Sequence, residues 1–231
     1  MNRFTILLTL IVLTTHCFGQ DKFIIKELRG SFPNLSKNDV KASRSKLFED
    51  SLYIVSKTCN GEWGGTIKFK NKKTGIVYSA ASTCPVVVNK LNGKYYVTNT
   101  LAHLRGFSEV LEISNPDSMS VFELSNIVWN ESKSTKGTKQ LLDSIGVLIL
   151  VSFPYNGQLY HVVANYEKTF LTKIENNKFV TIDTVSNTSL RSSNPAAFVL
   201  ENGHFLVRFK NQNAKGYLDI FENQITVVQN R

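Results

Sequence analysis

Several common functional signals are missing from this 231-residue chain. No apolar run reaches the roughly 20 residues of a membrane-spanning helix, so no transmembrane segment is predicted after signal removal. The H-E-x-x-H motif, clustered His and Cys ligands and the EF-hand series do not occur, so neither a metal site nor a cofactor is predicted. A G-x-S-x-G elbow and a phosphate-binding Gly loop before a helix are missing as well. The sequence therefore assigns no reaction by motif.

The amino terminus has the layout of a secretory signal peptide at residues 1–19. A single basic residue, Arg3, precedes an apolar stretch at 4–13, and small residues follow near Gly19. Cleavage there would leave Gln20 as the new amino terminus, and the protein is predicted to be secreted or periplasmic. An alternative is lipid anchoring through Cys17. We favour it less, because His16 stands where lipoprotein signals have a small residue.

Charge and composition narrow the class of partner. The formal net charge is +9, with the excess spread over lysines, and 42% of the residues are hydrophobic. That apolar share is sufficient for a folded core. A solvated basic surface explains the charge, and export makes nucleic acid an unexpected partner. Anionic glycans or a negatively charged envelope surface are compatible with it.

Two cysteines, Cys59 and Cys84, follow the signal segment. In an oxidising compartment an isolated pair of cysteines is most simply a disulfide. The alternative is a catalytic or redox thiol. A redox pair is typically two residues apart and a nucleophile needs a nearby base, and the sequence shows neither. We therefore predict a structural Cys59–Cys84 bridge.

The chain divides into a lead-in at residues 20–50 and a single all-β domain at 51–231. Within the lead-in, the segment 36–50 predicts one short helix, because Ser36 is a good cap and Asp39 falls in the first turn. After Asp50 the pattern changes to short β-branched and aromatic runs separated by Gly- and Lys-rich turns. These runs, at 52–56, 66–70 and 76–80, predict strands.

Three related units follow, at residues 85–115, 147–177 and 197–224. Each has an apolar strand, an Asn-Gly turn, a second strand, a polar connector and a third strand, and Asn-Gly is a strong hairpin signal. The turns are Asn92-Gly93, Asn156-Gly157 and Asn202-Gly203, and the third strands end near Ile113, Ile174 and Ile220. Fourth strands are predicted at 120–124, 179–183 and 225–228.

Four short antiparallel strands repeated about every 40 to 45 residues resemble the blades of β-propeller repeat proteins. The stretch 59–115 also resembles an uncharacterised group of secreted bacterial proteins. The resemblance implies an all-β, propeller-like fold of four-stranded units. The alternative fold is a β-sandwich or a barrel-like meander. Because no Trp-Asp or kelch motif accompanies the repeats, the resemblance bears on fold and not on activity.

Two connectors contain the candidate ligand-binding residues Glu62, Trp63, His103 and Arg105. The loop CNGEWGG at 59–65 combines glycines with an aromatic ring beside a carboxylate, a pairing that suits sugar or cation binding. The connector LAHLRGF at 101–107 places His103 and Arg105 between strands, where binding residues often lie. The structural alternatives are that Trp63 caps a unit beside the disulfide and that His103 is a hydrogen-bonding residue of a connector.

Two functional hypotheses follow. The preferred one is an exported, non-catalytic binding or interaction module for a protein or glycan of the cell envelope. The alternative is a secreted hydrolase that acts on a glycan with Glu62 as acid or base. Such catalysis needs two carboxyls about 5 to 10 Å apart. Glu109, Glu112 and Asp117 are the other available acids, and the sequence does not show which of them meet.

Overall fold

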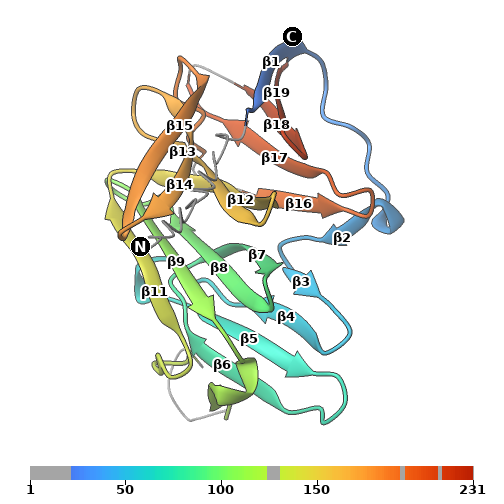
Figure 1. Ribbon diagram of the computed structural model, residues 1–231, viewed down its shortest axis with the longest axis vertical. Helices are drawn as coiled ribbons and strands as arrows, with labels where there is room; N and C mark the ends of the chain where they lie inside the picture. The colour runs from blue at the N-terminus through green and yellow to red at the C-terminus, as the bar shows by residue number, and fades with distance from the viewer. Residues whose placement is uncertain (1–21, 124–130, 193–195, 213–214, 231) are drawn as a thin grey trace, which may run out of the picture.

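The computed structural model describes residues 22–123, 131–192, 196–212 and 215–230. The predicted signal peptide at 1–19, with Cys17, lies outside the described residues, so export and lipid anchoring stay predictions. Within the described ranges no helix is long and apolar enough to cross a bilayer. This part of the chain is all-β, with four sheets (Figure 1).

We number the four sheets by their order along the chain. Sheet 1 has the order β10-β6-β5-β4-β3, formed by β3 Phe48–Glu49, β4 Tyr53–Lys57, β5 Thr66–Asn71, β6 Val77–Ala81 and β10 Ser120–Val121. Sheet 2 has the order β11-β9-β8-β7, formed by β7 Pro85–Leu91, β8 Lys94–Leu101, β9 Phe107–Ile113 and β11 Lys139–Ile145.

The other two sheets come from the second half of the chain and its amino-terminal lead-in. Sheet 3 has the order β12-β13-β14-β15, formed by β12 Leu148–Tyr155, β13 Gln158–Ala164, β14 Thr169–Glu175 and β15 Lys178–Ser186. Sheet 4 has the order β1-β19-β18-β17-β16-β2, formed by β1 Ile24–Arg29, β2 Val40–Ala42, β16 Ala196–Leu200, β17 Phe205–Lys210, β18 Lys215–Phe221 and β19 Gln224–Gln229. Pairing is antiparallel except that β1 runs parallel to β19.

The side chains of strand β5 alternate between the core and the solvent. Ile67 and Phe69 are fully buried in the core, whereas Lys68 and Lys70 point the other way and are partly or fully exposed. The strand therefore has one buried and one solvated face at these four positions. Thr66 belongs by its spacing to the solvated face but is fully buried. Its hydroxyl donates a hydrogen bond to the carboxylate of Glu131.

The predicted helix at 36–50 is wrong. The segment contains only the 3-10 turn Lys37–Asp39, followed by β2 and β3. The predicted cap interaction is present, since the amide of Ser36 donates to Oδ2 of Asp39 over 2.7 Å. The apolar side is too narrow to hold a helix on the core, and two sheet edges offer backbone partners instead. β2 pairs with β16, and the amide of Leu47 donates to the carbonyl of Val55.

The three Asn-Gly turns occupy equivalent places. Each joins the first to the second of the consecutive strands that form its unit: β7 to β8, β12 to β13, and β16 to β17 of the run β16–β19. In the first two turns both residues have positive φ, at 50° and 78° for Asn92-Gly93 and at 45° and 73° for Asn156-Gly157, as a two-residue hairpin requires. In the third turn only Gly203 does. The repeated hairpins of the sequence are therefore real structural units.

The fourth strands were predicted correctly in two units of three. β15 and β19 close sheets 3 and 4 where the second and third units predicted them. In the first unit the prediction at 120–124 is wrong. There β10 pairs with β6 of sheet 1, and β11 closes sheet 2 instead. Both segments are short and amphipathic, so pairing depends on which sheet edge each reaches.

Two apolar clusters fix the main packing. Sheets 1 and 2 pack through aromatic rings, with centroids 5.9 Å apart for Tyr53 and Tyr95 and 5.3 Å for Phe69 and Tyr95. Sheets 3 and 4 share a larger cluster that includes Phe153 and Val207. Edge-to-face ring pairs of the first kind contribute about 0.5–1.5 kcal/mol beyond their buried area. The molecule thus has a lower half of sheets 1 and 2 and an upper half of sheets 3 and 4 in Figure 1.

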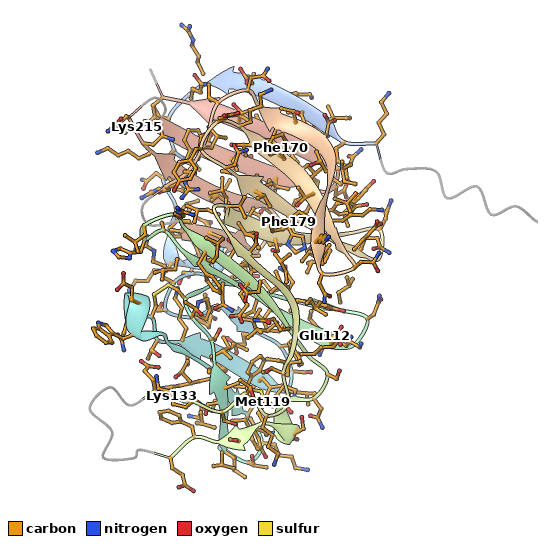
Figure 2. All side chains as sticks on the ribbon, turned by 90° about the vertical axis from the view of Figure 1, so that its left-hand side faces the viewer. Glu112, Met119, Lys133, Phe170, Phe179 and Lys215 are labelled. Atoms are coloured by element: carbon orange, nitrogen blue, oxygen red, sulfur yellow. A yellow bond between two sulfur atoms is a disulfide. The ribbon has the colours of Figure 1, made fainter. Side chains whose placement is uncertain are left out.

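Sheets 2 and 3 meet through both apolar and polar contacts. Val110 and Ile149 belong to one small apolar cluster, against which Phe179 packs; Figure 2 shows Phe179 above Glu112 at this boundary. Beside it, Thr98 donates to Ser152 over 2.7 Å, and Ser152 lies 2.7 Å from Nδ1 of His161. Thr98, Ser152 and His161 thus form a continuous chain of buried hydrogen bonds. A buried hydrogen-bonded layer therefore joins the two halves.

Candidate functional site

The connections of the sheets emerge at two opposite ends. In an antiparallel sheet successive strands reverse direction, so the connection after the second strand lies away from the one after the first. We call the end with the Asn-Gly turns, together with residues 50–52 of sheet 1, the turn end. The other end, formed by residues 58–65, 102–106, 146–147, 165–168 and 187–192, is the loop face. All four predicted ligand-binding residues belong to the loop face.

The predicted disulfide is confirmed, and it belongs to the loop face. Cys59 in the β4–β5 loop is bonded to Cys84 in the β6–β7 connection, with an S–S distance of 2.05 Å and Cα atoms 4.8 Å apart. The bridge ties a loop of sheet 1 to the segment that enters sheet 2. It restricts how far the candidate loop can move away from the rest of the molecule.

Glycines shape the loop that presents Glu62 and Trp63. A 3-10 turn at Gly61–Trp63 is enclosed by positive φ values at Gly61 and Gly64, of 63° and 85°. A Cβ atom at Gly65 would lie only 2.5 Å from the carbonyl oxygen of Thr58, so the backbones approach closely there. The turn projects Trp63 outward, and 68% of its surface is exposed.

The loop is also anchored from behind by a buried carboxylate. Glu131 accepts hydrogen bonds from the hydroxyls of Thr58 and Thr66 and from Nδ2 of Asn60, the last over 2.7 Å. Glu131 is 5% exposed, and its three donors supply the partners that a buried carboxylate requires. Residues 58–66 are therefore held in one conformation on their inner side, whereas the Trp63 side chain points to solvent.

The structure brings two predicted site residues together. Oε1 of Glu62 contacts Nδ1 of His103, and this contact joins the β4–β5 loop of sheet 1 to the β8–β9 connector of sheet 2. Both side chains are more than half exposed, so the pair is open to solvent and to a ligand. No sequence spacing links these two residues; the contact depends on the packing of sheet 1 against sheet 2.

The connector with Arg105 is bound to sheet 3 through its backbone. The carbonyl of Arg105 accepts from the hydroxyl of Tyr166 and from Nη2 of Arg191, each over 2.9 Å. Nη1 of Arg191 donates to the carbonyl of Gly146 over 3.0 Å, and its guanidinium lies 4.1 Å from the centre of the Tyr166 ring. The side chain of Arg105 is exposed and has no ion pair among the described residues. The connector is thus fixed, and the guanidinium is available.

Sequence analysis missed three members of this surface. Leu104 is 85% exposed with a φ of 49°, Tyr166 is 62% exposed, and Arg191 holds the connections together. A weak signal was available for Tyr166, since an aromatic residue between polar ones at 165–168 marks a loop tip. No pattern points to Arg191, because its role depends on contacts with two other sheets.

Sheet 4 reaches the same face through Asn211. Its Nδ2 donates to the carbonyls of Ser189 and Arg191, over 2.7 and 3.1 Å. Ser189 in turn donates to the carbonyl of Asn165 over 2.6 Å. Connections from all four sheets are therefore linked across the loop face.

The four acids considered from the sequence have separate partners. Glu112 pairs with Lys94 over 2.9 Å, Asp117 accepts from the hydroxyl of Tyr53, and Glu62 contacts His103. Glu109 accepts from Asn99 and Gln140 beside a cavity of about 280 Å³. Within the described chain these four acids contact different partners, and none of those partners is another of the four.

Glu109 nevertheless has one acidic neighbour. Asp143 lies directly opposite it in the β9–β11 pairing. Burial raises the pKa of Glu109, and the charge of Asp143 raises it further, against the lowering effect of the Gln140 hydrogen bond. Asp143 does not line the adjacent cavity, so the two carboxyls do not face a common space there.

A second recess opens at the turn end. Its volume is about 570 Å³, and every sheet contributes to its wall: Phe48 of β3, Val88 of β7, Phe153 of β12 and Val199 of β16. The walls are mainly apolar. Sequence patterns do not show this pocket, because its walls come from four segments that meet only in the folded chain.

Neither possible metal ligands nor similarity to known proteins identifies a function for this chain. Across the residues that the structure describes, no group of three or more His, Cys, Asp and Glu side chains is arranged to hold a metal ion. Comparison of the chain with family models, with curated proteins and with solved structures finds no match. Function has to be argued from the geometry of the site.

Proposed function

We propose that this protein is an exported, non-catalytic binding module and that its loop face binds a protein or glycan of the cell envelope. One observation supports this most: side-chain contacts between different sheets hold the exposed residues of the loop face in place. The Glu62–His103 pair joins sheets 1 and 2, and Tyr166 and Arg191 join the Arg105 connector to sheet 3.

Such an arrangement suits binding for two physical reasons. Loops that are already ordered lose little conformational freedom when a partner docks, so more of the contact energy appears as affinity. Trp, Tyr and Arg are also the side chains enriched among residues that dominate binding energy. Trp63, Tyr166 and Arg105 supply all three types on one face, and exposed Leu104 adds an apolar contact.

We further propose that the scaffold is propeller-like. Three features support it: neighbouring strands follow the chain order in sheets 2 and 3 and over β16–β19 of sheet 4, the Asn-Gly turns join equivalent strands of the three units, and all four sheets line one recess. In addition, β1 from the amino-terminal side pairs with the last strand, β19, so the two ends of the described chain lie in one sheet.

The hydrolase alternative receives less support. Its acid, Glu62, is solvent-exposed and contacts His103, and no second carboxyl is among its contacts within the described residues. Glycan hydrolysis uses two carboxyls at a defined separation. Assays of wild type and Glu62→Gln on envelope glycans would separate the hypotheses, since a binding module releases no new sugar ends with either protein.

The test of the binding proposal is retention of envelope partners on immobilised protein. Trp63→Ala and Arg105→Ala should each weaken capture of the retained partner about tenfold or more, as for central residues of an interface. Leu52→Ala is the matched control, because Leu52 is also exposed but lies at the turn end. Capture should be unchanged in that variant.

Two outcomes would contradict the proposal. If both loop-face variants retain every partner of the wild type, the loop face is not the binding surface. If Leu52→Ala loses the partner as well, binding depends on general surface hydrophobicity. Circular dichroism of each variant shows whether the fold is retained, and all three residues are exposed, so we expect it to be.

A further inference from the structure

A basic pocket lies on the outer side of sheet 4 and adjoins the loop face at Ser192. Its volume is about 500 Å³. The inner side of sheet 4 packs into the core through Val207, Phe209 and Leu218, whereas Arg208 points outward between them. The lead-in crosses this outer side and adds Phe32 and Arg44 to the pocket wall. The pocket therefore lies between two segments distant in sequence.

Arg208 is held in this pocket by aromatic rings. Its guanidinium lies 3.7 Å from the centre of the Phe32 ring and 5.6 Å from that of Phe198. Phe32 is in turn positioned edge-to-face on Tyr217, with centroids 5.3 Å apart. Stacking of this kind orients the planar guanidinium and leaves its N–H donors at the edge.

Those donors have no acceptor within the described chain. Arg208 makes only its two ring contacts there, with no hydrogen bond or ion pair. A guanidinium fork matches a carboxylate in two parallel hydrogen bonds. The rings thus orient the Arg208 guanidinium for anion binding, and its N–H donors stay available to a ligand.

The surrounding charges have one sign. Arg44, Lys210 and Lys215 line the pocket with Arg208, and no acidic residue is among the described residues that form its wall. The positive potential extends inward: burial lowers the pKa of Lys57 to about 8, and the charge of Arg44 lowers it further in the same direction. An anion in the pocket would offset this concentration of charge.

We propose that this pocket binds the carboxylate of an acidic sugar, with Arg208 as the bidentate contact and Lys210 and Lys215 as flanking charges. The aromatic wall favours a sugar over a small inorganic anion, because the apolar face of a sugar ring packs on Phe32 and Phe198. An acidic glycan is also the partner class compatible with the +9 formal charge of the chain. This site adjoins the loop face at Ser192. Its binding groups are different side chains from Glu62, Trp63, His103 and Arg105, and it does not depend on the function proposed for them.

Calorimetric titration with a trimer of galacturonate in low salt tests the proposal. The wild type should bind it saturably with one site, and a neutral glucose trimer should give no saturable signal. Arg208→Gln should weaken binding about tenfold or more through loss of the charged, bidentate contact. Arg208→Lys should also weaken it, since lysine keeps the charge but lacks the fork. Phe32→Leu should weaken it through loss of stacking.

Lys178→Gln is the matched control, because it removes one exposed positive charge from β15 of sheet 3. Its affinity should stay within twofold of the wild type. Unchanged affinity in Arg208→Gln, or an equal loss in Lys178→Gln, would overturn the site. Equal affinity for inorganic sulfate would overturn its assignment to a sugar. The loop-face capture experiment on Arg208→Gln should give the wild-type result and shows that the variant is folded.

Discussion

The two ends of this molecule are built differently from the same strands. At the turn end, Asn92-Gly93 and Asn156-Gly157 are two-residue turns in which the backbone reverses locally. At the loop face the connections are longer and contact one another across sheets, through the Glu62–His103 pair, the Cys59–Cys84 bridge and the hydrogen bonds of Arg191. Local sequence determines the conformation of the turn end, whereas contacts between sheets determine the conformation of the loop face.

This difference between the two ends favours the loop face as the binding surface. A short turn has few exposed side chains and little freedom to vary, whereas longer connections can present residues without disturbing the strands. At the loop face the cross-sheet contacts supply rigidity that such connections otherwise lack. Changes at the turn end should therefore alter stability alone, and changes at the loop face should alter stability and binding together.

The largest effect is expected from the buried layer that joins sheets 2 and 3. Burial lowers the pKa of His161 to about 3. As pH falls below about 6.5 the unfolded chain takes up this proton and the folded chain does not, so the free energy of unfolding decreases until pH reaches about 3. At 1.36 kcal/mol per pKa unit, the loss at the acid end is on the order of 5 kcal/mol.

Urea unfolding at pH 7, 5 and 4 measures this effect. His161→Gln keeps a carbonyl that can accept from Ser152 but does not titrate, so its stability should depend less on pH than that of the wild type. Because the carboxyls titrate in both proteins, the difference in pH dependence between them measures the contribution of His161 alone. Identical pH dependence in the two proteins would contradict a buried neutral His161.

The disulfide should give the next largest effect, at the loop face. Replacement of Cys59 and Cys84 by serine should reduce the free energy of unfolding by about 3 kcal/mol, because the chain between them gains freedom when unfolded. The same variant should bind loop-face partners more weakly, since the Glu62 loop loses its covalent tie. Chemical denaturation and partner capture measure the two effects. A stability loss with unchanged capture would show that Glu131 and His103 suffice to position the loop.

The smallest effect is expected at the turn end. Gly157→Ala places a Cβ on a residue with a φ of 73°, where no other atom lies within 4 Å of the new carbon, so the cost is conformational alone. We expect a loss of about 1 kcal/mol in the free energy of unfolding. Binding at the loop face should be unchanged. Weaker partner capture in this variant would show that the two ends are coupled.

Sequence patterns predicted the hairpins well because the necessary information is local. An Asn-Gly pair between apolar runs specifies both a turn and the register of its two strands. The closing strand of sheet 2 could not be found in this way, since β10 and β11 are both short and each pairs with a strand distant in the chain. The helix predicted at 36–50 failed for the same reason, because two sheet edges competed for its backbone.

The same distinction between local sequence signals and long-range contacts applies to the candidate site. Glu62, Trp63, His103 and Arg105 were recognisable as loop residues of suitable chemistry, but the Glu62–His103 contact was not. Tyr166 and Arg191 were missed because they act on a connector of another sheet. The outer pocket of sheet 4 was missed because Phe32 reaches Arg208 only after the lead-in crosses the sheet.

The sequence by itself determined the strands of the three repeated hairpins, their Asn-Gly turns and the pairing of its two remaining cysteines, because each depends on neighbouring residues or on a choice of one partner. Only the tertiary structure decided which strand closes each sheet and which loops share a face. It also decided which aromatic rings orient Arg208. These features depend on contacts between segments far apart in the chain, and local patterns of apolar and polar residues do not specify such contacts.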